Sequence, residues 1–554
     1  MMRPPIRWPT VSVIVLSILL GLIAVGLPAQ APVHPLGAAS GGPFWQVSPL
    51  SWMAVAVLAM LCLLTQSPAA KLAAIVSFSA ATLGALGAIE SLGVFHDSWQ
   101  NVGLGQLAIS ADQAAAAVQV PYVASTPGAF LLLGLLRHVF ADTPSFLRLY
   151  PALSALWYCA GLYSLATAFA QIHAEELRVD RTRFGLMTVF AFLALASLFW
   201  VRINPAPQSL AFTLMPFCLA ALVQARHDVR FRIVALAVFG AIVSIHPITS
   251  FMIVGLGLAW LLTDRLIQRF KSHAPIIRSN TIVLYACLFL SWMIYVGLWI
   301  VSTGESFVRR MFEALNSGQH ASVTAATTRG LEGFVWLHRA ALVGGGLLVV
   351  IGLAALIATR RITAVRLLAW LATAAAWLPL LFFGEFADRA PLFASLPAAL
   401  IVGWLLSVDV SRRARWAIGA LMVVTTMTSH ITAYSNHIGE VITQAEVSAF
   451  EVIVELGDDR RIAYGYVPPL TGDDLEVYSS RRARAYAIGA ADFDYAQLRA
   501  HGTTIVISGQ MREAATARGA QAVDRLNQFE AQLLADPGYE LIYDNGEVRA
   551  YRAR

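Results

Sequence analysis

The sequence predicts a mainly α-helical, polytopic membrane protein with a small soluble α/β domain at its C-terminal end. Hydrophobic residues make up 58% and charged residues only 13% of the 554 residues, which is far from the composition of a soluble globular domain. Apolar segments of spanning or near-spanning length recur through residues 1–437. Arginines cluster between these segments in every second loop, as is typical of cytoplasmic loops. After about residue 437 the composition becomes that of a soluble domain, which we expect over residues 438–554.

The first apolar segment, 11–29, follows Arg3 and Arg7 and precedes a small-residue stretch that resembles a signal-peptide cleavage site. It is longer than a typical signal-peptide core, so an uncleaved anchor is favoured, although cleavage stays an alternative. Further apolar segments are expected to form helices at 49–66, 70–91, 147–170, 184–201, 207–224, 231–246, 249–263, 281–301, 339–358, 363–383, 390–407 and 415–433.

The arginine clusters determine how the apolar segment 126–140 is interpreted. If it spanned the membrane, every later cluster would lie outside, against the excess of basic residues expected in cytoplasmic loops. The segment is short, begins with Pro127 and ends near Arg137, which favours an interfacial or re-entrant helix. The alternative, inversion of the first three helices, would place Lys71 outside. The interfacial interpretation predicts about thirteen spans with the N-terminus inside and the C-terminus outside. The clusters are Arg178/Arg181/Arg183, Arg226/Arg230/Arg232, Arg265/Arg269/Lys271/Arg278, Arg360/Arg361/Arg366 and Arg412/Arg413/Arg415.

The C-terminal segment predicts a small α/β domain outside the cytoplasm. Helical patterns occur at 440–456 and 519–535, and short apolar runs at 461–466 and 503–508 predict strands. Near the end, Asn545-Gly546 separates two alternating segments, which predicts a hairpin whose tight turn uses positive φ values.

Composition also excludes several classes of site. The net charge of +6 arises from short basic clusters between apolar segments, so it does not indicate a nucleic-acid partner. His320, Glu332 and His338 lack metal-ligand spacing, so no metal site is proposed, although the involvement of a divalent cation stays open. No cofactor is predicted. The four cysteines all lie in apolar segments and predict neither disulfides nor a zinc site; they are Cys62, Cys159, Cys218 and Cys287.

Polar residues gather on the face that this topology places outside, in outer loops 92–146 and 302–338 and beside later helix ends. The stretch 95–101 follows the third apolar segment and opens a loop, 92–125, that contains no Lys or Arg. Its carboxylate, Asp97, is the strongest candidate for a chemical centre. The alternatives are a solvated residue at a helix end and, for His96 and Trp99, anchors at the membrane surface. The other candidate site residues are Gln100, Tyr122, Arg148, Arg202, His246, Glu385, Asp388 and Arg389.

The order of these features resembles a known superfamily. An acidic residue in an early outer loop is followed by Tyr122-Val-Ala-Ser-Thr-Pro127-Gly, a short apolar helix and Phe146-Leu-Arg148-Leu-Tyr-Pro. This order is similar to the N-terminal half of the GT-C polytopic glycosyltransferases, which include protein O-mannosyltransferases and the aminoarabinose transferases of lipid A. Asp388-Arg389-Ala-Pro-Leu-Phe resembles a late loop and helix of that superfamily, and 538–551 resembles the end of its bacterial soluble domain.

The resemblance implies a membrane enzyme of the bacterial plasma membrane and cell envelope. Its first large outer loop would carry the catalytic carboxylate and lie over the membrane as juxtamembrane helices. It would transfer a sugar from a polyprenyl-phosphate donor to an acceptor glycan, lipid or protein, with inversion. Asp97 would be the general base, with His96 beside it. The lipid phosphate needs cationic partners, first Arg389, then Arg202 or Arg148; the substrate-binding candidates are Trp99, Gln100, Tyr122, His246, Glu385 and Asp388.

The sequence departs from the family pattern in two ways. Asp97 follows the third apolar segment instead of the first, and Ser98 stands where the mannosyltransferases carry a second acid. Two other classes stay open: a transporter or flippase, and a non-catalytic envelope scaffold. The spans show no inverted repeat and no ionisable residue that we place near the bilayer midplane, which disfavours the transporter.

Overall fold

The structure is a computed structural model that describes most helices of the membrane domain and the core of the C-terminal domain. It describes residues 10–26, 48–84, 96–110, 114, 120–140, 142–195, 204–269, 275–297, 309, 332–376, 389–435, 444–456, 462–464, 486–487, 504–509, 511–512, 515 and 520–554.

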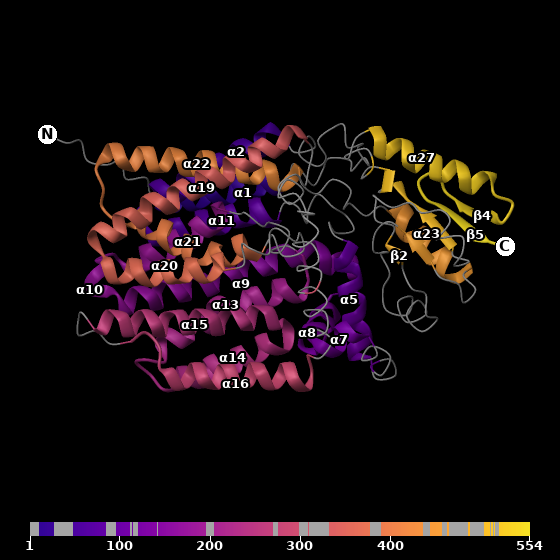
Figure 1. Cartoon of the computed structure of the whole chain (residues 1–554). Helices are drawn as coiled ribbons and strands as arrows, with labels where there is room; N and C mark the ends of the chain where they lie inside the picture. The colour runs from indigo at the N-terminus through magenta and orange to yellow at the C-terminus, as the bar shows by residue number, and fades with distance from the viewer. Residues whose placement is uncertain are drawn as a thin grey trace.

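The membrane domain is a bundle of helices that run back and forth along one common direction (Figure 1). Its helices are long apolar segments. Several of them carry proline at the first or second position, which suits the first helical turn because no N–H is needed there. The bundle helices are α1 (Thr10–Gly26), α2 (Pro49–Leu64), α3 (Pro68–Ser79) with its π-helical continuation η4 (Ala80–Gly84), α9 (Thr143–Ile172), α11 (Arg181–Ala194), α13 (Pro207–Gln224), α14 (Arg230–Ile245), α15 (Pro247–Gln268), α16 (Ser279–Tyr295), α19 (Glu332–Thr359), α20 (Arg361–Ala375), α21 (Arg389–Ser407) and α22 (Arg412–Ser435).

The helices occur where the apolar segments predicted them, with differences at their ends. The segment 207–224 matches α13 at both ends. By contrast, α9 begins four residues earlier than expected because the Asp142 carboxylate accepts a hydrogen bond from Ser145 N at 2.7 Å. The Asp180 carboxylate caps α11 in the same way. These caps extend the helices beyond the apolar windows.

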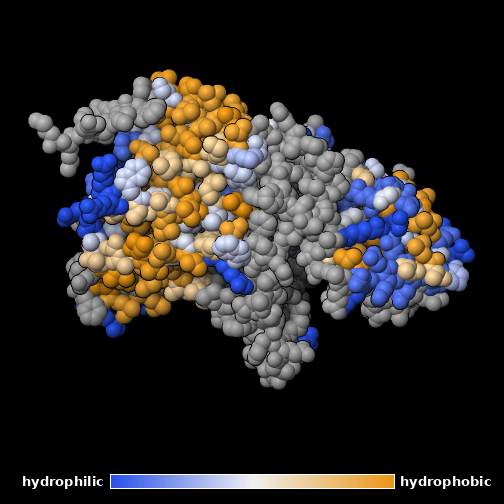
Figure 2. Space-filling view, turned by 90° about the horizontal axis from the view of Figure 1, so that it is seen from above, coloured by the Kyte–Doolittle hydropathy of each residue, from blue (hydrophilic) through white to orange (hydrophobic). Residues whose placement is uncertain are grey.

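Four of the described helices are long and apolar enough to cross a membrane: Thr143–Ile172, Pro207–Gln224, Pro247–Gln268 and Arg339–Thr359. The other apolar helices among the described residues are shorter, with 10 to 17 residues. Figure 2 shows a broad hydrophobic surface over the bundle, whereas the C-terminal domain is mostly hydrophilic. These features fit a membrane protein; the thirteen spans and the inside position of the N-terminus stay predictions.

The connections that carry the arginine clusters meet at one end of the bundle, which we call the basic end. The Asp409 carboxylate pairs with both Arg183 and Arg415 there. The Glu176 carboxylate accepts a hydrogen bond from Thr363 N at 2.9 Å, which joins α10 (Ala174–Leu177) to α20. The connections around residues 176–183, 360–363 and 409–415 are thus neighbours in space, although they lie far apart in the sequence.

The opposite end, which we call the outer end, carries three short helices: α5 (His96–Ile109), α7 (Pro121–Ser125) and α8 (Pro127–His138). Figure 1 shows α5 lying across the ends of the bundle helices. Within the expected outer loop 92–125, residues 96–109 thus form a helix, as the family resemblance implies for a juxtamembrane element. Every described side chain of α5 is at least partly buried, and the two glycines of the helix lower its helix propensity. The 12 residues of α8 extend about 18 Å, less than the hydrocarbon core of about 30 Å.

The C-terminal domain is a small α/β unit around a mixed five-stranded sheet of order β2-β1-β3-β5-β4. Strand β1 is parallel to β2 and β3, and β5 is antiparallel to β3 and β4. The expected hairpin is present, but four residues, 545–548, connect its strands, and among them only Gly546 has a positive φ, of 85°. The expected tight turn is therefore a wider one. The elements are α23 (Gln444–Leu456), β1 (Ile462–Tyr464), β2 (Tyr486–Ala487), β3 (Thr504–Ile507), α27 (Ala520–Ala535), β4 (Tyr539–Asp544) and β5 (Arg549–Ala553).

Candidate functional site

The predicted carboxylate lies in the first turn of α5 at the outer end. His96 and Asp97 are the first two residues of this 14-residue helix; the structure describes their backbone but not their side chains. Backbone N–H groups at a helix N-terminus are unpaired and carry partial positive charge, which favours anionic groups nearby. The position therefore suits an ionised carboxylate.

The start of α5 is fixed to the bundle by a buried hydrogen bond. The Ser98 hydroxyl donates to Asn204 Oδ1 at 2.8 Å, and both side chains are buried. Asn204 lies just before α13, whose first turn contains the buried Gln208. The residue that stands in place of a second acid thus positions the helix that carries Asp97.

Helix α5 also packs against α8 with direct backbone contact. A Cβ atom added to Gly105 would lie 2.8 Å from Gly134 N, and one added to Gly134 would overlap Gly105 O. Glycine is therefore required at both positions, because any side chain would push the helices apart. At the other side of α8, a Cβ atom on Gly128 would meet Ser244 of α14, so α8 is seated closely on the bundle.

The aromatic candidates take part in this packing. Trp99 is only 3% exposed, which is at odds with its alternative as a surface anchor. The ring of Tyr122 packs edge-to-face on Phe130, with centroids 5.4 Å apart, and remains partly exposed. Trp292 of α16 donates its indole N–H to Ser125 O at 3.4 Å, which holds α7 in place. Gln100 is also partly exposed.

His246 connects two helices of the bundle. It ends α14 through a hydrogen bond from its backbone N to Ile242 O, and it precedes Pro247, the first residue of α15. Its Nδ1 lies 2.9 Å from Thr249 Oγ1, and the side chain is buried. The imidazole is therefore engaged in holding this junction.

Among the candidate arginines, only Arg148 has a described side chain. Arg148 is exposed on the second turn of α9, where its charge acts on the Asp142 carboxylate. Arg389 is the first residue of α21, and its side chain is not described. Arg202, Glu385 and Asp388 lie outside the described residues. A shared contact of Asp97 and Arg389 with one phosphate stays a prediction. No group of three or more His, Cys, Asp or Glu within the described part of the chain could hold a metal ion.

The sequence interpretation missed a buried polar network at the basic end. Arg366 of α20 donates from Nε and Nη2 to Asp264 Oδ1 of α15, at 2.9 and 2.6 Å, and both side chains are buried. Arg366 Nη1 lies 3.4 Å from His173 Nε2, and His173 Nδ1 lies 3.1 Å from Thr363 Oγ1. Since Thr363 donates to Glu176, the geometry fits a neutral imidazole with its proton on Nδ1.

Asp264 lies in the last turns of α15, just after the predicted segment 249–263, and Arg366 lies near the start of α20. The two residues are joined across 102 positions of the chain. The available signal for Asp264 was an acidic residue directly after the apolar segment 249–263. Its partner was assigned to a solvent-facing arginine cluster, because a contact between distant segments does not follow from local composition.

No family model matches the chain, and no curated protein matches its sequence. Among solved structures, the chain is similar to the oligosaccharyltransferase of Archaeoglobus fulgidus tethered to an acceptor peptide, with 12% identity and a TM-score of 0.46 over 98% of this chain and 74% of that one. It is also similar to the same enzyme in complex with Zn and sulfate, with 12% identity and a TM-score of 0.44 over 91% and 73%. Because both TM-scores are below 0.5, neither similarity establishes a shared activity.

Proposed function

We propose that this chain is a GT-C-like membrane glycosyltransferase that transfers a sugar from a polyprenyl-phosphate carrier to an acceptor at the extracytoplasmic face. The arrangement of α5 supports the proposal best. This helix carries Asp97 in its first turn, crosses the end of the bundle opposite the arginine clusters, and is fixed by Ser98 and Gly105. The resembled superfamily carries its catalytic carboxylate in a juxtamembrane element of this kind.

In the proposed reaction, Asp97 acts as the general base. Its carboxylate takes the proton from the acceptor hydroxyl while the hydroxyl oxygen attacks the anomeric carbon of the donor sugar. The bond from that carbon to the carrier phosphate oxygen breaks, the electron pair stays on the phosphate, and the configuration inverts. Arg389, or else Arg202 or Arg148, stabilises the phosphate charge. His96 assists the base.

The described side chains refine the substrate-binding assignments. Gln100 and Tyr122 are partly exposed at the outer end, so they are accessible to a sugar. Trp99 and His246 are buried, and we assign them to positioning the surrounding helices. Glu385 and Asp388 keep their proposed substrate contacts, which derive from their position beside Arg389 in the sequence.

The test is turnover of polyprenyl-phosphate sugars by the purified full chain in proteoliposomes. The readout is released polyprenyl phosphate, which reports transfer whatever the acceptor, with a panel of donor sugars and a membrane-lysate acceptor pool. We expect Asp97→Asn to reduce turnover by about 10²- to 10⁴-fold. Asp142→Asn is a matched control at the outer end, because asparagine caps a helix as well as aspartate does.

Full turnover by Asp97→Asn at a normal folded amount would show that Asp97 is not the base. Absence of turnover with every donor, together with movement of the intact sugar lipid between leaflets, would favour the flippase alternative. Absence of both activities would favour the envelope scaffold.

A further inference from the structure

A second polar feature lies at the basic end, away from the proposed active site. A pocket of about 210 Å³ opens between the end of α13, the start of α14 and the segment before α16. Its walls combine apolar residues with three arginines, Arg226, Arg232 and Arg278. The apolar walls and the one hydroxyl are Leu222, Ala225, Pro275, Ile276, Ile277 and Thr281.

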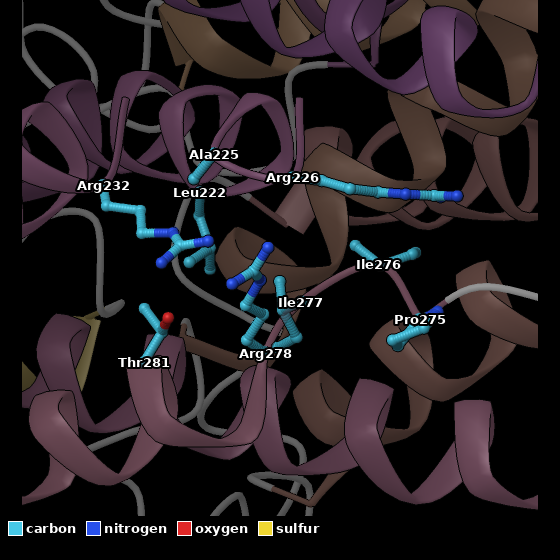
Figure 3. Close-up of a pocket in the computed structure, with 9 residues that line it drawn as sticks. All are labelled: Leu222, Ala225, Arg226, Arg232, Pro275, Ile276, Ile277, Arg278 and Thr281. Atoms are coloured by element: carbon cyan, nitrogen blue, oxygen red, sulfur yellow. The ribbon is translucent and has the colours of Figure 1, made fainter. Parts of the chain in front are cut away.

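The three arginines give this pocket a positive charge. In Figure 3, Arg232 and Arg278 extend toward one another into the pocket, whereas Arg226 extends along its far side. Neither of the two converging guanidinium groups forms an ion pair with a described carboxylate. Two like charges that converge at a partly enclosed surface repel each other unless an anion lies between them.

The nearby carboxylates already have partners. Asp264 Oδ1 binds Arg366, and its Oδ2 accepts a hydrogen bond from Ile276 N at 2.6 Å, so it fixes the pocket wall without facing the pocket arginines. Asp228 Oδ1 accepts from Arg230 N at 2.9 Å. Asp409 pairs with arginines of other connections. The pocket is therefore a rigid, positively charged recess.

The surroundings of the pocket indicate that its ligand is a lipid. Helices α14 and α16 form one edge of the bundle, at the bottom of Figure 1. Within about a turn of the pocket they expose large apolar side chains, among them Val229 (62%) and Ile233 (72%) on the α14 side and Val283 (61%) on α16. An anionic headgroup on Arg232 and Arg278 would leave its acyl chains against this apolar surface.

We propose that the pocket formed by Arg226, Arg232 and Arg278 binds the phosphate headgroup of an anionic membrane lipid. Arg232 and Arg278 hold the phosphate by charge-assisted hydrogen bonds, and Thr281 offers a hydroxyl beside it. Arg226 adds positive potential. The site is independent of the proposed sugar transfer, since it lies at the opposite end of the bundle.

The test measures lipid retention by native mass spectrometry of the purified full chain, titrated with phosphatidylglycerol, with phosphatidylcholine and with inorganic phosphate. We expect the wild type to bind phosphatidylglycerol about tenfold or more tightly than phosphatidylcholine. The double variant Arg232→Gln/Arg278→Gln should lose that preference. Arg265→Gln/Arg269→Gln is the matched control, because it removes the same charge from exposed residues at the same end, outside the pocket.

Unchanged phosphatidylglycerol binding in the double variant, or an equal loss in the control, would overturn the proposal. Inorganic phosphate that binds as tightly as the lipid and displaces it would assign the pocket to a free anion instead of a lipid. If the double variant does not fold, Arg278→Gln alone serves, because Arg278 is exposed and its substitution disturbs no buried contact. The single variant should lose about half of the logarithm of the affinity ratio between phosphatidylglycerol and phosphatidylcholine.

Discussion

The two ends of the helical bundle are held together by different kinds of contact. At the outer end, α5 is fixed by close backbone packing of Gly105 on Gly134 and by a hydrogen bond between uncharged groups, Ser98 and Asn204. At the basic end, the described contacts include the buried ion pair of Arg366 with Asp264 and the pairs of Asp409 with Arg183 and Arg415. Shape thus positions the end that carries the proposed catalytic carboxylate, and charge stabilises the other.

This difference has a chemical consequence. Because Ser98 and Asn204 are uncharged, this hydrogen bond fixes the start of α5 without the use of an ionised side chain. A buried ion pair, by contrast, compensates the desolvation of both its members and cannot release either one cheaply. The following predictions test the contrast, from the largest expected effect to the smallest.

Removal of one member of the buried pair should have the largest effect. Arg366→Met leaves Asp264 charged and buried without its guanidinium partner, at an expected cost of about 3–5 kcal/mol in the free energy of unfolding. Thermal unfolding of the full chain in detergent measures it. The double variant Asp264→Leu/Arg366→Met should be more stable than Arg366→Met. Equal stability of Arg366→Met and the wild type would mean that charge does not hold this end.

Substitution at the glycine contact should disturb the outer end. Gly134→Ala inserts a methyl group against Gly105 O, so α5 must shift, at an expected cost of about 1–3 kcal/mol together with a fall in sugar transfer. The control is Gly346→Ala in α19, because a Cβ atom added there would meet no atom of another helix within 4 Å. This substitution should stabilise α19 by about 1 kcal/mol. Indistinguishable effects of the two substitutions would disprove close packing between α5 and α8.

The hydrogen bond between Ser98 and Asn204 should give a smaller effect. A double-mutant cycle of Ser98→Ala and Asn204→Ala should yield a coupling of about 0.5–1.5 kcal/mol, the usual net contribution of such a bond. Thermal unfolding gives the coupling, and turnover shows whether the bond also positions Asp97. Additive effects of the two substitutions would indicate that the side chains act independently.

The smallest effect should come from acidification of the C-terminal domain. Burial would raise the pKa of Glu530, but Arg549, Arg512 and the Tyr551 hydroxyl keep it below its usual value. Its stabilisation is therefore fully present above the unfolded-state pKa of about 4.3 and is lost as the pH falls through the lower folded-state pKa. The protection of β4 and β5 against hydrogen exchange, relative to the intrinsic rate at each pH, should fall in that range, and Glu530→Gln should weaken this pH dependence. Identical pH profiles for wild type and variant would exclude this role.

Hydropathy predicted most of the bundle because burial in lipid or protein is a local property of each segment. It placed α13 residue for residue, and the apolar segment 126–140 coincides with α8. It failed for α5, whose residues 96–109 combine polar side chains with glycines and are helical because tertiary contacts cover them. Local pattern could not anticipate a helix that is buried on nearly every side.

The candidate site was predictable to a smaller extent. Asp97 stood out because an isolated acid followed an apolar segment, but its supports, Ser98 and Asn204, lie 106 positions apart. The Asp264–Arg366 pair illustrates the same limit, since nothing in either segment identifies the other. Contacts between distant segments depend on how helices are arranged, which composition does not specify.

The buried pair also has a consequence for biosynthesis. Asp264 is synthesised 102 positions before Arg366, the residue that neutralises it. At a synthesis rate of about 5–20 residues per second, about 5–20 s pass between the synthesis of Asp264 and that of Arg366. During that interval, the Asp264 carboxylate has no described cation beside it, and its place near the end of α15 keeps it close to water. The ion pair can therefore form only after α20 has been synthesised. A chain terminated between the two residues would keep an unneutralised carboxylate at the edge of the membrane.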